Sequence, residues 1–400
     1  MSDVPRAGLE RADAVPAPAR RASAAALARL RRLAPDGPDE MGRELAEGPR
    51  AVADTLERLE ADLARVGGLL AGADRVVLVG TGASLAIART VAPAWRRGLR
   101  STGAGSPLVV RESTEGLFGG ADGDAFGAGD AVVAISQSGA SPETLAAAAL
   151  ASASGARVVA ITAHESSPLA RAADLVVATP IGEERGAATK SELSALAALL
   201  ALAGALPCDA SAREATGAWL DSLVRSWSEA LPAAIALATA RRTWFVGLGP
   251  TAGIAHAALL LWHEKAHRQA TATTLSEFRH GPIEAVTARD AVVLLAPHDP
   301  SAGYRGYLEL LAGELGRLGA ATIWVGPASA GAAGAGGRGA TILPCSAPDA
   351  PSGAGPALAL LGTTLRVQQL ARATAHAAGT YVDGFRVLRQ VVTAAPPAFD

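Results

Sequence analysis

The sequence predicts an α/β protein with two tandem domains, each a doubly wound parallel sheet with helices on both faces. Three observations lead to this fold class. Short runs of apolar and β-branched residues alternate with stretches of helical periodicity, as buried parallel strands alternate with crossover helices. The same succession of motifs occurs twice along the chain. The length of 400 residues is sufficient for two domains of ordinary size.

The composition excludes several classes of protein. Half of the residues are hydrophobic, yet no uncharged apolar run of about 18 residues occurs, so we expect no membrane span and no membrane partner. The net charge of −2, without a basic block, argues against a nucleic-acid partner. The N-terminal stretch is charged and lacks the apolar core of a signal peptide, and the two distant cysteines form no metal motif. These features fit a reducing, cytoplasmic location.

The first domain is expected over residues 74–206. Residues 1–40, rich in Ala, Arg, Pro and Asp, predict a flexible tail with at most one short helix, and 41–73 predict one or two leading helices. Strands of the first domain are expected at 76–79, 108–110, 131–135, 155–161 and 175–178. A helix over 85–95, kinked or ended by Pro93, follows the first strand, and a long helix is expected over 191–206.

The second domain is expected over residues 241–383, after a helical connector at 207–240 and before a C-terminal tail at 384–400. It repeats the first domain in three places, in the same order. Residues 77–88 align without a gap with 244–255, 130–136 with 290–296, and 155–161 with 319–325.

A hydroxyl-rich loop follows the third expected strand, at Ser136-Gln-Ser-Gly-Ala-Ser-Pro-Glu-Thr144. A strand that passes through such a loop into a helix N-terminus offers backbone N–H groups, a partial positive charge and hydroxyl donors, which suit a phosphate. The alternative is a turn with an ordinary helix cap, but so many polar side chains in one loop favour an anion site. The second copy has Ala296-Pro-His-Asp299 here, so we expect one phosphate site per chain.

The turn Gly80-Thr-Gly82 also raises the question of a dinucleotide site. Leu85 stands in place of the third glycine of that fingerprint, and Glu112 comes too late to be the acidic residue expected about 20 residues on. We therefore expect no nucleotide, and no other cofactor is predicted.

Together these motifs resemble the sugar isomerase (SIS) family over residues 41–393. The likeness is greatest to the tandem-SIS isomerase half of glucosamine-6-phosphate synthase and to amino-sugar-phosphate deaminases, AgaS-type deaminase/isomerases and fructosamine-phosphate deglycases. The matching motifs are Gly82-Ala-Ser84, Ser136-Gln-Ser-Gly-Ala-Ser141, Gly182-Glu-Glu-Arg-Gly-Ala-Ala-Thr-Lys190, Gly253-Ile-Ala255, Glu264, Glu277-Phe-Arg-His-Gly-Pro282 and Val382-Asp383. No cysteine nucleophile begins the sequence, so we expect no glutaminase activity.

The resemblance implies a sugar-phosphate site in the first domain. The phosphate would be held by Ser84, Ser136, Gln137, Ser138 and Ser141. Thr189 and the backbone around Ala187 and Ala188 would contact sugar hydroxyls. Ala188 stands where the family has a serine, so one of these hydrogen bonds would be missing.

Moving a proton between adjacent sugar carbons requires a base beside an enolisable carbon. Glu264, on a helix expected over 254–267, matches the catalytic glutamate of the family. Its spacing alone is also that of a solvated helix residue, or of an ion-pair partner for Lys265 or His267.

His280 is the histidine with motif support, since it precedes Gly281 and Pro282 on a rigid loop. An imidazole titrates near neutral pH, which suits the opening of a cyclic sugar by proton transfer. In relatives this histidine comes from the neighbouring subunit, so the resemblance implies a homodimer with a shared active site. The other histidines lack motif support, and no carboxylate pattern turns them into a metal site.

Two further acids flank His280. Glu277 matches a family glutamate and is assigned to substrate binding. Glu284 resembles a residue of the deglycase branch and is a third catalytic candidate, because a second carboxyl group can protonate a leaving amine. The alternative for either residue is a salt bridge at the end of the loop.

The departures from the family concern lysines. Leu261, Ala378 and Gln390 stand where the synthase has lysines, so the amine for its Schiff-base chemistry is missing at the usual places. Lys190 and Lys265 are the only possible replacements, and Lys190 matches a structural lysine of the family. A carboxylate and a histidine suffice for isomerisation, deamination or deglycation. We expect deamination and isomerisation of a hexosamine 6-phosphate, with deglycation of a fructosamine phosphate or sensing of a sugar phosphate as alternatives.

Overall fold

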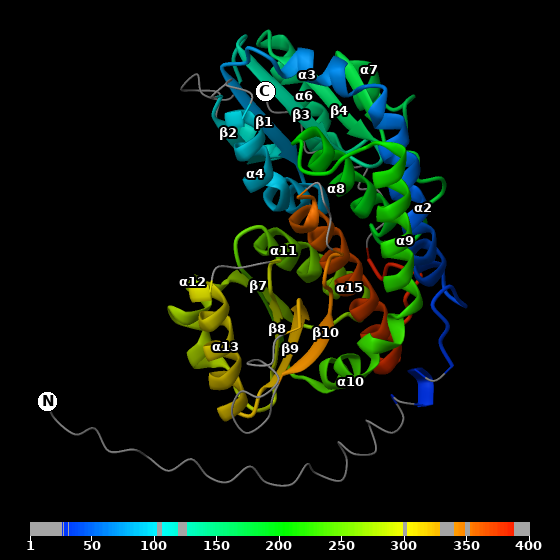
Figure 1. Cartoon of the computed structure of the whole chain (residues 1–400), viewed down its shortest axis with the longest axis vertical. Coiled ribbons are helices and arrows are strands. Elements are labelled where there is room, and N and C mark those ends of the chain that lie inside the picture. Colours follow the sequence, from blue (N-terminus) through cyan, green and yellow to red (C-terminus); the bar gives the residue numbers. More distant parts are fainter. Residues whose placement is uncertain are drawn as a thin grey trace, which may run out of the picture.

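The computed structural model describes residues 26, 28–30, 32–101, 106–118, 126–298, 302–328, 340–348 and 353–387. These residues form two five-stranded parallel sheets with helices packed around and between them (Figure 1). The predicted fold class is confirmed.

The first sheet has the strand order β2-β1-β3-β4-β5. Its strands are β1 (Arg75–Gly80), β2 (Leu108–Glu112), β3 (Asp130–Ile135), β4 (Arg157–Thr162) and β5 (Leu175–Ala178). The helices of this domain are α4 (Ala83–Ser101), α5 (Ser113–Phe118), α6 (Pro142–Ala153), α7 (Pro168–Ala172) and α8 (Lys190–Leu202).

Both faces of this sheet are buried, as its continuous apolar strands predict. On β1, Val76 and Leu78 enter the large core shared with α4 and α8, whereas Val77 and Val79 pack on the opposite face against alanines of α6. Successive side chains of a strand point to opposite faces, so a strand covered on both sides must be apolar throughout.

The second sheet has the order β10-β9-β8-β6-β7, which is the order of the first sheet for the equivalent strands. Its strands are β6 (Thr243–Gly247), β7 (Ala270–Thr274), β8 (Ala291–Leu295), β9 (Ala321–Gly326) and β10 (Thr341–Pro344). Its helices are α11 (Thr251–Leu261), η3 (Trp262–Ala266), α12 (Leu275–Arg279), η4 (Pro282–Ala285) and α13 (Ala302–Arg317).

The strand register confirms the predicted repeat. Val77 pairs with Val132 in the first sheet and Trp244 pairs with Val292 in the second, which are the positions aligned in sequence. An ion pair at the start of the sheet is repeated as well. Arg75 donates to Asp130 at 3.0 Å, and Arg242 donates to Asp290 at 3.1 Å.

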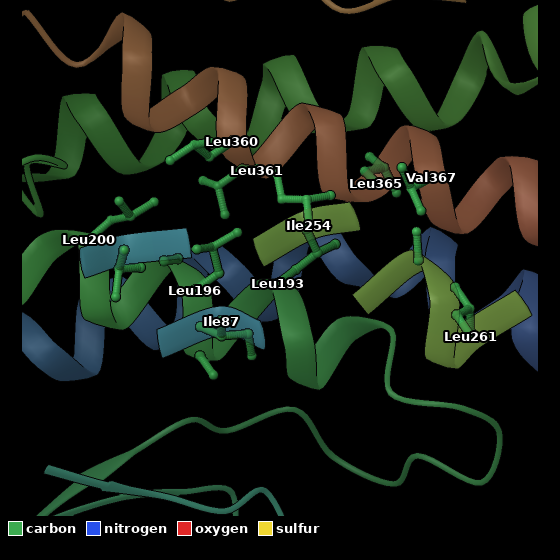
Figure 2. Packing of buried hydrophobic residues seen from close by; sticks show 14 of the residues in the cluster. Ile87, Leu193, Leu196, Leu200, Ile254, Leu261, Leu360, Leu361, Leu365 and Val367 are labelled. Atoms are coloured by element: carbon green, nitrogen blue, oxygen red, sulfur yellow. The ribbon is translucent and has the colours of Figure 1, made fainter. Parts of the chain in front are cut away.

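One hydrophobic core joins the two domains. Side chains of α4, α8, α11 and α15 (Gly355–Ala378) interdigitate there, and Figure 2 shows Ile87, Leu196, Ile254 and Leu361 among them. Helices α4 and α11 approach closely because residue 253 is glycine. A Cβ atom on Gly253 would lie 2.5 Å from the carbonyl oxygen of Ala86.

Helices outside the sheets complete the molecule. They are α2 (Glu40–Glu60), α3 (Leu63–Leu70), α9 (Ala210–Arg225), η2 (Trp227–Ala230) and α10 (Leu231–Thr239). Figure 1 shows α15 passing between the two domains, with α2 and α9 on its outer side. Among the described residues, no helix has the length and apolar character needed to span a bilayer.

Part of the stretch expected as a tail is packed. Leu30 is buried in the core, and residues 28–30 are helical. The buried Arg372 of α15 donates to both carboxylate oxygens of Asp39 and to backbone carbonyls before it. Burial opposes the ionisation of Asp39, but hydrogen bonds from His376 and Arg372 hold its pKa well below the ordinary value.

Two helices differ from the prediction. Helix α4 neither ends nor breaks at Pro93 but continues to Ser101. The carbonyl that loses its helical donor belongs to the exposed Arg89, where water is available. In the stretch expected as one helix over 254–267, the α-helix ends at Leu261. A single π-helical turn, η3, follows it, and His267 then takes a left-handed conformation with φ of 49°.

Candidate active site

The predicted phosphate loop lies at the carboxyl end of the first sheet, where β1 and β3 are neighbours. In the order β2-β1-β3-β4-β5 this is the point at which successive connections leave in opposite directions, and it is where open α/β sheets bind ligands. The N-termini of α4 and α6 follow these two strands directly. The fold therefore places two helix N-termini at one edge, as an anion requires.

The loop itself is held in a tight turn. Gly139 has φ of 58°, and a Cβ atom there would lie 2.1 Å from the hydroxyl of Ser167. The Oγ atoms of Ser136 and Ser141 share a hydrogen bond of 3.1 Å, and Ser138 accepts one from the N–H of Ala140 at 3.2 Å. Ser141 is the N-cap residue of α6, yet its hydroxyl accepts no N–H of that helix. The serines are thus brought together at a helix end that no side chain caps.

Ser84 and Gln137 face a common cavity of about 30 Å³. Ser84 lies in the first turn of α4 and Gln137 follows β3. The wall opposite them is the N-terminal end of α8, where Ala188, Ser191 and Glu192 line the cavity. The structure therefore brings together residues from three of the motifs singled out in the sequence.

Thr189 is buried, but its hydroxyl already has a partner. It donates to the carboxylate of Glu184 at 3.2 Å, and the Thr189 N–H donates to the same oxygen at 3.0 Å. Glu184 also accepts the N–H of Ser191 at 3.0 Å, so it fixes the start of α8. Thr189 therefore stabilises the turn at the start of α8 through Glu184. Its neighbour Ala188 lines the cavity.

Glu264 lies in η3, half-buried at the end of α11. Burial raises its pKa, and the charge of Lys265 opposes this only in part. A carboxylate with a raised pKa is a better proton acceptor than an exposed one. Its charge contributes to the raised pKa of Glu192, which lines the cavity that Ser84 and Gln137 face, whereas Glu264 itself does not line that cavity.

His280, Glu277 and Glu284 lie elsewhere. All three are exposed: Glu277 lies on α12, Glu284 on η4, and His280 at the end of α12 between them. Figure 1 shows α12 on the outer flank of the second domain, away from α9 and α15. The structure does not bring this group to the cavity of its own chain.

Glu277 has a structural partner that the sequence analysis missed. It forms a capping box with Thr274, whose N–H donates to the Glu277 carboxylate at 3.2 Å and whose hydroxyl donates at 2.9 Å. These hydrogen bonds hold the pKa of Glu277 below its usual value. The pattern Thr-x-x-Glu before a helix is a signal that could have indicated this role.

The two lysines do not replace those of the family. Lys190 is buried and forms an ion pair with Glu47. Lys265 is also buried, with Nζ 4.0 Å from the centre of the Phe385 ring and 3.5 Å from the Gly384 carbonyl oxygen. Burial lowers the pKa of Lys265. Leu261 belongs to the core, whereas Gln390 lies outside the described residues.

The position of Glu112 in the fold does not exclude a dinucleotide, contrary to the expectation from its distance in sequence. Glu112 is the last residue of β2, paired with Gly80, and so stands where a ribose-binding acid would stand despite its distance in sequence. Its carboxylate accepts hydrogen bonds from Thr81 and Thr114. These outweigh burial and keep the pKa of Glu112 low. The missing third glycine, at Leu85, remains the argument against a dinucleotide.

Glu192 is the site residue that the sequence analysis missed. It is 7% exposed and accepts a hydrogen bond of 2.8 Å from the amide of Gln368. Burial raises its pKa to about 8, and the charges of Glu184 and Glu264 act in the same direction. The helix that carries Glu192 is predicted from its alanines and leucines. A single acidic residue in such a helix matches no sequence motif that would indicate a site. The described residues hold no cluster of His, Cys, Asp and Glu side chains suited to a metal ion.

The first sheet, its helices and the hydroxyl-rich loop after β3 are those of an α/β domain of the SIS type. The family model described as "SIS domain" matches residues 69–205, which are the first sheet and its helices. The second sheet repeats that topology. The chain belongs to the SIS-domain proteins.

In sequence the chain is similar to glutamine–fructose-6-phosphate aminotransferases (isomerizing). The protein from Aeropyrum pernix is 34% identical over 278 residues, which are 66% of this chain and 44% of the relative. The one from Pyrobaculum aerophilum is 30% identical over 302 residues, which are 73% of this chain and 48% of the relative. The chain thus spans about half the length of the curated relatives it matches.

Solved structures share the fold. The C-terminal domain of glucosamine-fructose-6-phosphate aminotransferase from Francisella tularensis has a TM-score of 0.71 at 23% identity, covering 88% of this chain and 99% of that domain. Tagatose-6-phosphate ketose/aldose isomerase from Escherichia coli has a TM-score of 0.72 at 22% identity, covering 88% and 96%. At these identities the likeness shows that the fold extends over both domains.

Proposed function

We propose that the chain is a sugar-phosphate isomerase and deaminase that acts on a phosphorylated amino sugar such as a hexosamine 6-phosphate. One observation carries the proposal. Glu264, a carboxyl group with a raised pKa, acts electrostatically on Glu192, which lines the same cavity as Ser84 and Gln137. In the proposal, Glu264 is the base of the site whose phosphate-binding residues include Ser84 and Gln137. The sugar-phosphate-acting relatives support the same class of substrate.

In the proposed reaction the phosphate is anchored by Ser84, Gln137 and the hydroxyls of Ser136, Ser138 and Ser141. The small cavity is the floor of the site, and the sugar carbons lie above it toward η3. His280 of a second copy of the chain moves a proton from the anomeric hydroxyl to the ring oxygen and opens the ring. The exposed position of His280 supports this sharing of the site in a homodimer.

Glu264 then takes the proton from C2 of the open-chain amino sugar and returns it to C1. The product is a C2 imine, to which water adds before ammonia leaves. The balance is one amino sugar phosphate and one water converted to one ketose phosphate and one ammonia. No lysine is required, in keeping with the partners that Lys190 and Lys265 already have.

Deglycation of a fructosamine phosphate is the second candidate. Glu284 favours it, because it is exposed near His280 and would enter the shared site with that histidine. A second carboxyl group can protonate a leaving amine. Sensing of a sugar phosphate is the third candidate. The site would then bind the sugar phosphate without converting it.

A substrate panel tests the proposal. Glucosamine 6-phosphate, its N-acetyl derivative and a fructosamine 6-phosphate are incubated with the full chain, and ammonia and ketose phosphate are measured. Ammonia and fructose 6-phosphate from the first compound are expected. Amine release from the fructosamine phosphate alone would favour deglycation, and binding without turnover of any compound would favour sensing.

A further inference from the structure

We propose that Glu192 is a specificity-determining residue of this site, which selects a substrate bearing an ammonium group over its hydroxyl counterpart. The inference rests on the proposed function and names the group that recognises the amine. Neither Glu192 nor Gln368 was among the motifs of the sequence analysis.

The position of Glu192 is the first support. It lies in the first turn of α8 and lines the cavity that Ser84 and Gln137 face. Its side chain is almost fully buried and is held from the other side by Gln368 of α15. Gln368 also donates to the carbonyl of Thr189 at 3.2 Å, so one amide group fixes both ends of this turn. A carboxyl group fixed in this way keeps its direction when a ligand arrives.

The charge around Glu192 is the second support. The groups that act on it most strongly are Gln368, which is neutral, and the carboxylates of Glu184 and Glu264. No cation is among them. Both lysines of the chain are engaged elsewhere, with Glu47 and with Phe385. With its pKa raised to about 8 by burial, Glu192 favours its protonated form at pH 7 without ligand, and Lys265, whose charge acts on Glu264, is not among the groups that act on Glu192.

An unpaired acceptor beside Glu192 is the third support. The amide oxygen of Gln368 is buried and accepts no hydrogen bond from the described residues. Buried polar atoms without partners are rare and call for a ligand or another explanation. An ammonium group has three donors and no acceptor, so from the cavity it can donate to the carboxylate of Glu192, which lies between the cavity and this amide. A hydroxyl group has a single donor.

The consequence is a coupled ionisation. When an ammonium group binds, the carboxylate form of Glu192 is favoured and its proton passes to the solvent. The charge-assisted hydrogen bond is stronger than a neutral one, and we expect the amine to bind roughly tenfold to a hundredfold tighter than the hydroxyl analogue. The hydroxyl analogue leaves Glu192 protonated.

Calorimetry with two unreactive open-chain compounds tests this. 2-Amino-2-deoxyglucitol 6-phosphate and glucitol 6-phosphate share the phosphate and chain but differ at C2, and neither has a carbonyl group to react. Binding to the full chain is measured at pH 7 in two buffers of different ionisation enthalpy. We expect preference for the amino compound and release of one more proton with it than with glucitol 6-phosphate.

Two variants complete the test. Glu192→Gln keeps the shape and a hydrogen bond with Gln368, and it should bind both compounds with similar affinity and without the extra proton. Glu214→Gln, on an exposed position of α9, is the matched control and should retain the wild-type preference. Thermal unfolding of each variant checks that it is folded.

The outcomes are distinct. Equal binding of both compounds by the wild type, or a preference without extra proton release, would overturn the role of Glu192 and leave the sugar-phosphate function intact. Binding of neither compound would overturn the proposed function and this inference with it. The wild-type comparison decides the matter even if Glu192→Gln does not fold.

Discussion

The two sheets of this chain have the same strand order and the same register, yet the loops after their third strands differ. After β3 comes Ser136-Gln-Ser-Gly, with its paired serines, and after β8 comes the Ala296-Pro-His stretch. The ion pair that closes the opposite end of each sheet is present in both domains. The features that hold the duplicated fold were therefore kept twice, whereas the hydroxyl cradle exists in one copy.

The helices after the first strands show the converse difference. Helix α4 continues regularly to Ser101, while its counterpart α11 changes at Leu261 into the π-helical turn that carries Glu264. π-Helical turns of this kind are frequent at functional sites. When the gap-free alignment is continued along the helix, the counterpart of Glu264 is Arg97, an exposed residue. In the proposed reaction the first domain supplies the anion site and the second supplies the base.

The largest expected effect is at this pair of positions. Glu264→Gln should lower kcat for the amino sugar phosphate roughly 10²- to 10⁴-fold, the range for loss of a general base, with KM little changed. Arg97→Gln, at the equivalent position of α4, should leave kcat unchanged. Steady-state ammonia release measures both. A similar fall in both variants would mean that the two helices do not differ in function.

The second prediction compares the loops. Ser138→Ala should raise KM for the sugar phosphate about tenfold, because a phosphate hydrogen bond is lost, while kcat falls less. His298, the residue at the equivalent place after β8, should tolerate replacement by Ala with no change in KM. If His298→Ala weakens binding as much as Ser138→Ala, each chain holds two anion sites rather than one.

The third prediction concerns what the domains share. Arg75→Ala and Arg242→Ala should each lower the free energy of unfolding by about 1–2 kcal/mol, since each leaves a buried aspartate without its partner. Urea titration measures both values. If the two losses of unfolding free energy differ severalfold, the repeated ion pair does not stabilise the two domains equally.

The fourth prediction is a change in stability with pH, which concerns one residue of the site rather than both domains. The folded pKa of Glu192 is raised to about 8 from an ordinary 4.5, so the folded state binds more protons than the unfolded state between these values. Its contribution to stability is therefore present below pH 4.5 and is lost as pH rises toward 8. Relative to Glu192→Gln, the wild type should lose stability over this window in urea titrations. A difference that stays constant with pH would show that Glu192 does not titrate there.

Much of this fold could be predicted from the sequence because the strands are short, apolar and bounded by turns. The sequence repeat predicts which strands of the two domains are equivalent, and the register of the paired strands agrees with this prediction. The π-helical turn could not be predicted, since residues 254–267 have ordinary helical composition. Helix α4 continues through Pro93 with Arg89, the residue whose carbonyl lacks a helical donor, exposed, and no local sequence pattern shows this exposure.

The site was predicted in part for similar reasons. The serine loop is a local motif, and the structure brings the hydroxyls of Ser136 and Ser141 together, while phosphate binding by the loop stays a prediction. Glu192 and Gln368 are distant in sequence, and only the packing of α8 on α15 brings them together. Glu277 and Thr189 matched family motifs, but the hydrogen bonds to Thr274 and Glu184 give both a structural task.

The central claim is that Glu264 removes a carbon-bound proton from a sugar phosphate held by the first domain. Proton NMR in D₂O measures this directly, as the loss of the C2 proton signal of glucosamine 6-phosphate with enzyme present. The wild type should exchange this proton, and Glu264→Gln should bind the sugar yet exchange it at least about a hundredfold more slowly. Exchange by Glu264→Gln at the wild-type rate would contradict the claim.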